Sequence, residues 1–312
     1  MKVTLDLTRL LHEGAITQAE HDRLARLGRS ATGTLLVSLL LGFGVVAVVA
    51  GILLMVPNAV VSTGLGVSLM ISGLTLLLRG ARWSLLANIC ILVAALLLAA
   101  GIVLLGSDSD PPLPFYASCL FSAVVFVLCA VLTRSGLLIS LAVLALFAAL
   151  GGGASYHQAL YELQVGQPLC TVITFSLLAL AAHVASRFVT RTWSGLLIIT
   201  ARTSLLLVNL GFWVGSLQGD SLNWLLQGGQ GIPGVFFALV WAIGLISAGI
   251  WAGRTDRRWL LNLSAIFAGI HFYTQWFDRL GTHPLTVLLA GLVMLGMVVF
   301  LWRFNSRSHV NA

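Results

Sequence analysis

The amino-acid sequence predicts an all-α integral membrane protein with about ten transmembrane helices, on the basis of its composition and the length of its apolar runs. Of its 312 residues, 59% are hydrophobic and only 9% are charged, and the mean hydropathy is +1.01. A water-soluble domain needs far more surface charge than this. The apolar runs extend over about 18 to 25 residues, enough for a helix to cross a hydrocarbon core of roughly 30 Å. Short alternating strands are absent from the sequence, which argues against a membrane β-barrel.

Ten apolar runs carry the predicted transmembrane helices, and together they form one predicted domain over residues 33–312. Proline-containing breaks separate several runs, among them Pro57–Asn58, Gln167–Pro168 and His283–Pro284. Proline suits the first turn of a helix because its missing N–H costs little there. The predicted spans are 33–56, 59–78, 84–105, 114–133, 136–155, 169–188, 193–217, 233–253, 259–280 and 285–302.

The basic residues set the predicted orientation. With a cytoplasmic N-terminus, fifteen of the seventeen Lys and Arg residues fall on the cytoplasmic side, as the positive-inside rule requires. Ten spans then place the C-terminus in the cytoplasm as well, and we predict the inner membrane of a bacterium. The net charge of +7 is scattered between the runs, so no nucleic-acid partner is expected. The fifteen residues are Lys2, Arg9, Arg23, Arg26, Arg29, Arg79, Arg82, Arg134, Arg187, Arg191, Arg254, Arg257, Arg258, Arg303 and Arg307.

Residues 1–32 are predicted to form a cytoplasmic helical hairpin ahead of the first span. In "LTRLLHEGAITQAEHDRLARLG" (Leu7–Gly28), Gly14 suits the left-handed position that ends a helix. Thr17 and Glu20 have the spacing of a capping box, which begins a second helix. The apolar face of this hairpin is too small to be buried alone. We therefore expect it to dock on the spans, on the membrane surface or on a cytoplasmic protein partner.

The two ends of the chain resemble those of a group of uncharacterised bacterial membrane proteins, classed together as a domain of unknown function. Members of this group begin with a cytoplasmic "G-x-I-[ST]-x-x-[EQ]" helix pair, which the segment after Gly14 resembles. The stretch "HFYTQWFDRLGTHPLTVLLAGLVMLGMVVFLWRF" is similar to the group's ending, an aromatic-rich span, a short outer loop and a glycine-containing final span. The resemblance implies a helix pair followed by a bundle of spans, and it implies no activity.

One predicted span carries a permanent charge near its middle. "LLIITARTSLLLVNLGFW" (Leu196–Trp213) is apolar for almost all its length, yet it contains Arg202. A charged side chain at the centre of a span costs roughly 2.5–3.5 kcal/mol on insertion scales, and such residues usually face a cavity or a partner. Arg202 and Asn209 are seven residues apart and therefore share one face of the helix.

The ninth predicted span repeats this pattern. His271 and Asp278 are seven residues apart on one face, and Gln275 lies beside them. If the polar faces of the seventh and ninth spans meet, they form a polar seam from the cytoplasmic third of the bilayer to its outer surface. This seam is the predicted ligand-binding site, and its candidate residues are Arg202, Asn209, His271, Gln275 and Asp278.

Two interpretations of Arg202 follow from these positions. In the first, its side chain extends to the cytoplasmic interface, or bonds freed carbonyl groups and Asn209, and its role is structural. In the second, it is the counter-charge for an anionic lipid or a small organic anion, because a planar guanidinium suits bidentate contacts with phosphate or carboxylate. His271 similarly allows two interpretations, as a packing residue or as a proton relay towards Asp278.

The predicted function is transporter-like, with lipid or organic-anion handling through the seam. The alternative is a non-transporting scaffold or sensor that recruits a partner through Leu7–Gly28. An enzyme is not expected, because the GxSG, GxGD and HExxH motifs of intramembrane enzymes are absent from the sequence. The four cysteines lie in apolar runs without a CxxC pair, so we expect no metal and no cofactor.

Overall fold

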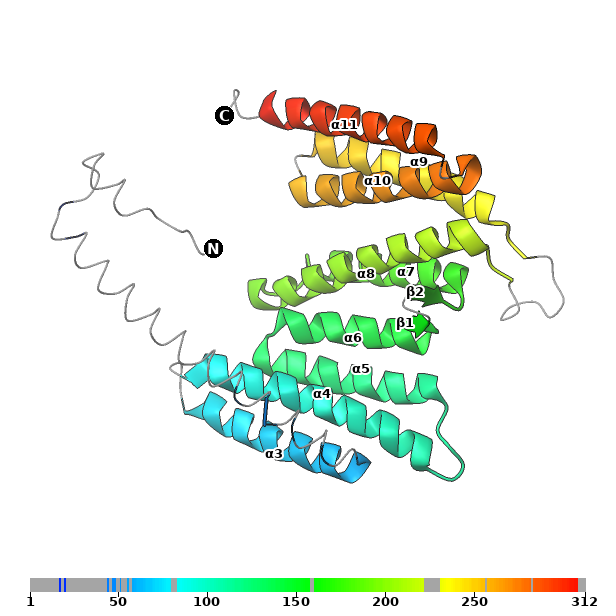
Figure 1. Cartoon of the computed structure of the whole chain (residues 1–312). Helices are drawn as coiled ribbons and strands as arrows, with labels where there is room; N and C mark the ends of the chain where they lie inside the picture. The colour runs from blue at the N-terminus through cyan, green and yellow to red at the C-terminus, as the bar shows by residue number, and fades with distance from the viewer. Residues whose placement is uncertain are drawn as a thin grey trace. The chain divides into compact units, whose positions relative to one another are not determined.

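The computed structural model describes residues 58–79, 83–157, 160–221, 231–255, 257–281 and 283–307, together with positions 17, 20, 44, 47, 48, 51 and 55. Within this part of the chain, nine helices and one two-stranded sheet follow in order (Figure 1). They are α3 (Ala59–Leu78), α4 (Ser84–Asp108), α5 (Phe115–Thr133), α6 (Gly136–Ala149), β1 (Gly152–His157), β2 (Leu160–Val165), α7 (Pro168–Ala185), α8 (Arg191–Gln218), α9 (Gly234–Arg254), α10 (Arg258–Leu280) and α11 (Pro284–Arg307).

The helices agree with an all-α membrane protein. Six of the described helices are long and apolar enough to cross a bilayer, namely α3, α4, α5, α7, α8 from Trp193 onwards, and α9. Two shorter apolar segments lie in α6 and in α11, over Gly136–Ala149 and Pro284–Gly296. α10 belongs to neither group, because polar residues are more frequent along it.

Nine of the ten predicted spans correspond to α3 through α11. The first predicted span, 33–56, lies mostly outside the described residues, although its described positions 44, 47, 48, 51 and 55 are helical. The chain divides into two compact units. The first comprises residues 1–149 and 188–199, and the second comprises residues 150–187 and 200–312.

In the first unit, small residues bring α3 and α4 close together. Ser62 is buried, and its hydroxyl donates to the carbonyl oxygen of Leu97 over 3.0 Å. A Cβ atom added at Gly73 would lie 2.6 Å from Cγ1 of Ile91, so only glycine fits there without a shift. Small residues allow transmembrane helices to approach in this way, and van der Waals packing then holds them together.

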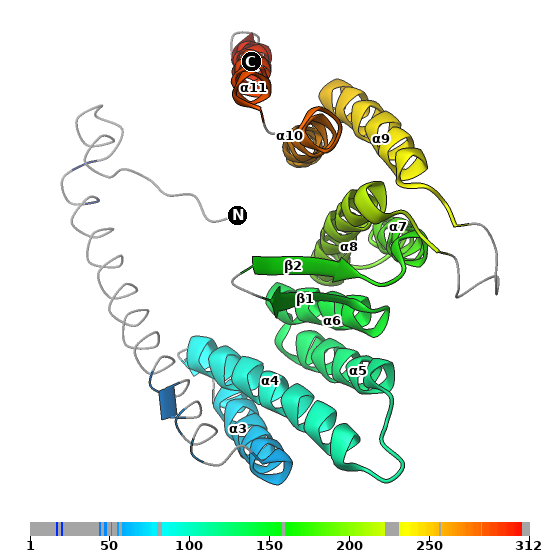
Figure 2. The same cartoon turned by 45° about the vertical axis from the view of Figure 1, so that its right-hand side comes forward.

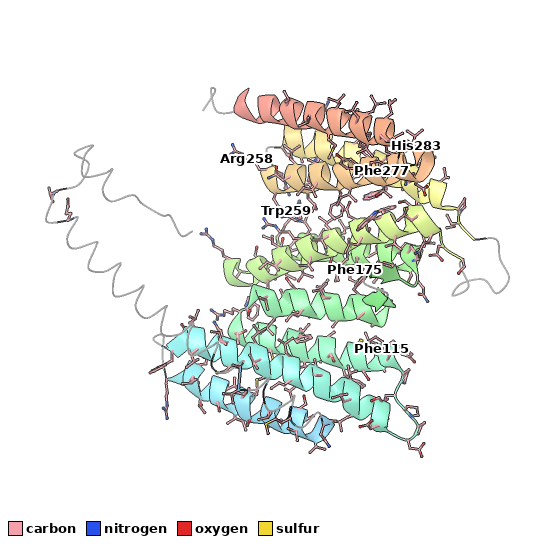
Figure 3. All side chains as sticks on the ribbon, in the orientation of Figure 1. Phe115, Phe175, Arg258, Trp259, Phe277 and His283 are labelled. Atoms are coloured by element: carbon pink, nitrogen blue, oxygen red, sulfur yellow. The ribbon has the colours of Figure 1, made fainter. Side chains whose placement is uncertain are left out.

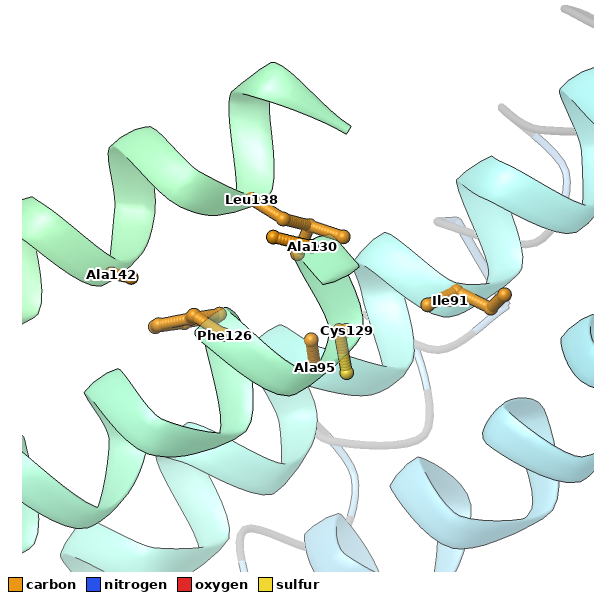
Figure 4. Packing of buried hydrophobic residues seen from close by; sticks show 7 residues of the cluster. All are labelled: Ile91, Ala95, Phe126, Cys129, Ala130, Leu138 and Ala142. Carbon is orange, nitrogen blue, oxygen red and sulfur yellow. The ribbon is translucent and has the colours of Figure 1, made fainter. Parts of the chain in front are cut away.

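The core of the first unit lies between α4, α5 and α6 (Figure 4). It combines small residues with larger apolar side chains, so that the helices interlock. Arg134 has the left-handed conformation, with φ of 54°, and it ends α5 just before α6 begins at Gly136. The buried members of this core are Ile91, Ala95, Phe126, Cys129, Ala130, Leu138 and Ala142.

A β-hairpin follows α6, and here the predicted span 136–155 is wrong. The helix ends at Ala149, and Gly152–His157 pairs in antiparallel fashion with Leu160–Val165 (Figure 2). Three consecutive glycines explain the early end, because glycine disfavours a helix interior. The first of them, Gly151, has a φ of 79°, which a side chain would strain.

In the second unit, a polar contact joins the start of α7 to the end of α8. The buried carboxylate of Asp220, just after α8, accepts a hydrogen bond from the backbone N–H of Leu169 over 2.8 Å. Leu169 is in the first turn of α7, where an anionic acceptor satisfies a free N–H and complements the helix dipole. α9 packs on α10, and the Trp276 indole of α10 donates to the carbonyl oxygen of Thr286 in α11 over 3.1 Å.

The predicted hairpin at Leu7–Gly28 lies outside the described residues, except for Thr17 and Glu20. These two form the predicted capping box. The backbone N–H and the hydroxyl of Thr17 each donate to Oε2 of Glu20 over 2.9 Å, and the N–H of Glu20 donates back to the Thr17 hydroxyl over 3.4 Å. The bond from the Thr17 backbone, followed by that from its hydroxyl, lowers the pKa of the Glu20 carboxyl.

Gly73→Leu is expected to lower the free energy of unfolding by about 1–3 kcal/mol, because the new side chain must displace Ile91 or part the two helices. The matched control is Gly64→Leu on the same helix, where glycine is exposed and an added Cβ meets nothing within 4 Å. Denaturant unfolding in detergent micelles measures both variants. Equal stability of the two would show that α3 and α4 do not depend on this close approach.

Candidate ligand-binding site in the second unit

Arg202 of α8 stacks on an aromatic ring at the beginning of α10. The carbon of its guanidinium lies 5.0 Å from the centre of the Trp259 ring. Arg202 is eleven residues into α8, roughly 16 Å along the helix. Trp259 is the second residue of α10, and Figure 3 labels it with Arg258 at the end of α10 opposite to Phe277. The arginine side chain therefore extends towards the start of the neighbouring helix.

The Arg202 side chain combines a positive charge held near an aromatic ring with guanidinium N–H groups that can donate hydrogen bonds to a ligand. A cation over a tryptophan face is stabilised by about 0.5–2 kcal/mol, depending on how far the pair is desolvated. The cation–π contact occupies no N–H donor with an oxygen acceptor. Arg202 is exposed, and among the described residues no carboxylate pairs with it. An anion with two oxygens could accept from the guanidinium edge in the bidentate geometry.

Trp241 of α9 connects two of the predicted site residues. Its indole Nε1 donates to Oδ1 of Asn209 in α8 over 2.9 Å. Its ring meets the His271 ring of α10 edge to face, with centroids 4.9 Å apart. Asn209 also donates through Nδ2 to the carbonyl oxygen of Leu205 over 2.8 Å. Asn209 of α8 and His271 of α10 thus both contact the Trp241 indole of α9.

A second tryptophan joins α8 directly to α10. The Trp213 indole donates to the hydroxyl of Thr274 over 2.9 Å. Around this bond, Trp241, Leu245 and Phe267 form a buried core against which Trp213 packs. The seventh and ninth predicted spans therefore meet in the second unit, at Arg202–Trp259 and again at Trp213–Thr274.

The remaining predicted site residues lie farther along α10. Nδ1 of His271 and Nε2 of Gln275 are buried, and neither atom has a hydrogen-bond partner within the described part of the chain. The hydroxyl oxygen of Ser204 in α8 is also buried and has no hydrogen-bond partner within the described part of the chain. Asp278 is exposed in the last turns of α10. The polar groups thus extend along most of α10, without the direct contacts of a closed network.

An open groove of about 460 Å³ lies on the side of α10 that carries Ile266 and Tyr273, away from His271. Its walls come from α8, α10 and α11, and apolar groups dominate them. Thr274 supplies a polar atom to this lining, and its hydroxyl already accepts the Trp213 hydrogen bond. We call this feature the α10 groove, and its principal lining residues are Trp213, Ile266, Gly269, Ile270, Tyr273 and Met294.

Sequence reasoning missed the connecting role of Trp241 and Trp213. A signal for Trp241 is its position, about 10 Å from the start of α9 and away from both helix ends. Tryptophan is usual at membrane interfaces, and farther inside a span its N–H must find an acceptor on a neighbouring helix. Asn209, as a polar residue within another span, was the obvious candidate for that acceptor.

No protein-family model matches the chain, and no curated protein or solved structure matches it either. Among the described residues, no three His, Cys, Asp or Glu side chains are grouped as a metal ion requires. The chemistry of the second unit must therefore be inferred from its own residues, and its distinctive elements are a cation, two indole-bridged contacts and an apolar groove.

Trp241→Phe is expected to lower the free energy of unfolding by about 1–3 kcal/mol, because it leaves Oδ1 of Asn209 partly buried without its donor. The cost should fall in the Asn209→Leu background, where that oxygen is absent, so a double-mutant cycle should show coupling. Trp251→Phe on the same helix is the control, since Trp251 is exposed and its ring can still contact Arg257 after the change. Additive effects in the cycle would mean that the indole bond contributes nothing to stability.

Proposed function

We propose that this protein is a transporter-like membrane protein that binds an anionic lipid or a small organic anion between α8 and α10. Arg202 is the proposed counter-charge. The observation that carries this proposal is the exposed guanidinium, fixed on the Trp259 ring without a carboxylate partner among the described residues. A charged side chain within an apolar helix makes insertion into the membrane less favourable, and such residues usually face a cavity or bind a partner.

The extent of the polar groups supports transport as well as binding. From Trp259 to Asp278, α10 covers roughly 28 Å, close to the thickness of a hydrocarbon core. His271 Nδ1 and Gln275 Nε2 lie on this stretch of α10, buried and without a hydrogen-bond partner in the described part of the chain, and we propose that a ligand supplies one. We propose Arg202, Asn209, His271, Gln275 and Asp278 as the residues that line the path of the ligand, and we propose no catalytic residue, metal or cofactor.

The alternative function is a scaffold or sensor that binds a cytoplasmic protein through Leu7–Gly28. The capping box between Thr17 and Glu20 supports it, because such bonds are typical of a helix start and these two residues lie outside the apolar spans. In this case Arg202 would have only a structural role.

We further propose that the protein crosses the bacterial inner membrane ten times, with both termini in the cytoplasm. Reporter fusions test it. A reporter that is active only in the cytoplasm should work when fused after Arg307 or at Arg134, and it should be silent when fused at Ser109. Activity at Ser109 would reverse the orientation, and silence after Arg307 alone would give an odd number of spans.

The ligand is tested by native mass spectrometry of protein purified in mild detergent. Wild type should carry an anionic molecule, and Arg202→Gln should lose its occupancy roughly tenfold or more, since a charge-assisted hydrogen bond contributes about 1.5–3 kcal/mol. Arg279→Gln, at the exposed far end of α10, is the matched control and should keep the ligand. Identical bare spectra for all three proteins would contradict the proposal and favour the scaffold.

A further inference from the structure

The α10 groove lies on the same side of its helices as the Arg202–Trp259 contact. On α10, Trp259, Ile266 and Tyr273 are seven residues apart, so they share one face. On α8, Arg202 and Trp213 are eleven residues apart, which is three turns and again one face. The cation and the groove therefore lie along the same faces of α8 and α10, and we call the two together the furrow.

Their separation along the furrow matches the two parts of a lipid. Trp259 is at the beginning of α10, where tryptophan and arginine side chains meet the headgroup region of a bilayer. The groove begins about 10 Å farther along α10, at Ile266, and ends about 22 Å along, at Thr274. A charged group bound at Arg202 would thus lie at the level of the lipid headgroups, and a hydrocarbon chain in the groove would contact apolar side chains.

We infer that the furrow is a binding site for one anionic phospholipid of the bilayer, an inference that rests on the proposed function and specifies its ligand. The phosphate accepts hydrogen bonds from the guanidinium of Arg202, and one acyl chain occupies the α10 groove. Ile266 is 61% exposed, so the furrow is open along its side. A second acyl chain can therefore remain in the surrounding bilayer.

A ligand with only the phosphate or only the acyl chain would match only one part of the furrow. A water-soluble anion would satisfy Arg202 and leave the apolar walls around Ile270 and Met294 without a partner. An uncharged hydrocarbon would fill the groove and leave the guanidinium without an anion. Charge complementarity at one end and apolar surface at the other select an amphiphile.

The decisive comparison uses wild-type protein and three probes, with binding followed by native mass spectrometry. The probes are long-chain phosphatidylglycerol, its water-soluble headgroup glycerophosphoglycerol, and long-chain phosphatidylcholine. Phosphatidylglycerol should bind at least tenfold more tightly than either of the others. If the headgroup binds as tightly as the lipid, the inference is overturned while the proposed anion site stands. If phosphatidylcholine, in which choline neutralises the phosphate charge, binds equally well, a net negative charge is not recognised and both proposals are contradicted.

A pair of matched variants tests the groove itself. Ile266→Trp places a large side chain in the groove and should weaken phosphatidylglycerol at least tenfold, while glycerophosphoglycerol binding stays unchanged. Ile243→Trp on α9 is the control, because Ile243 is 65% exposed, close to the exposure of Ile266, and does not line the groove. Wild-type lipid affinity in a folded Ile266→Trp protein would overturn the inference. If that variant does not fold, the comparison of the three probes decides.

Discussion

Helices in a bilayer gain little from burying apolar side chains against one another, because lipid tails are as apolar as leucine. Their association must come from close backbone approach and from polar groups that find partners on neighbouring helices. The first unit of this protein uses close approach, at the glycine and serine positions where α3 meets α4. The second unit uses indole N–H groups, which fix α8 against α9 and α10.

The helices were largely predictable because apolar length and proline punctuation act locally. Pro168 and Pro284 begin α7 and α11, and Pro233 caps α9, each within one residue of the predicted start. The β-hairpin at Gly152–Val165 was not predictable in the same way. Its first strand continues an apolar run with small residues, and only the pairing with the second strand distinguishes it from a frayed helix end.

The candidate site was predictable as a set of polar positions but not as an arrangement. Helical periodicity places Arg202 with Asn209, and His271 with Asp278, whatever the neighbouring helices are. Which side chains lie between these two faces depends on a third helix, and the Trp241 indole comes from α9. The α10 groove depends in addition on Met294 of α11, so it exists only when α8, α10 and α11 are all in place.

The polarity of α10 also bears on how the chain enters the membrane. A nascent helix leaves the insertion channel when lipid is a better solvent for it than water, and α10 lacks the uniform apolarity of α9. Among the described residues, its His271 ring has its aromatic neighbour, Trp241, on α9, which is synthesised first and can receive it. We therefore expect α10 to insert together with α9. The polar residues that we propose for ligand binding thus also tie the biogenesis of α10 to the order in which the spans emerge from the ribosome.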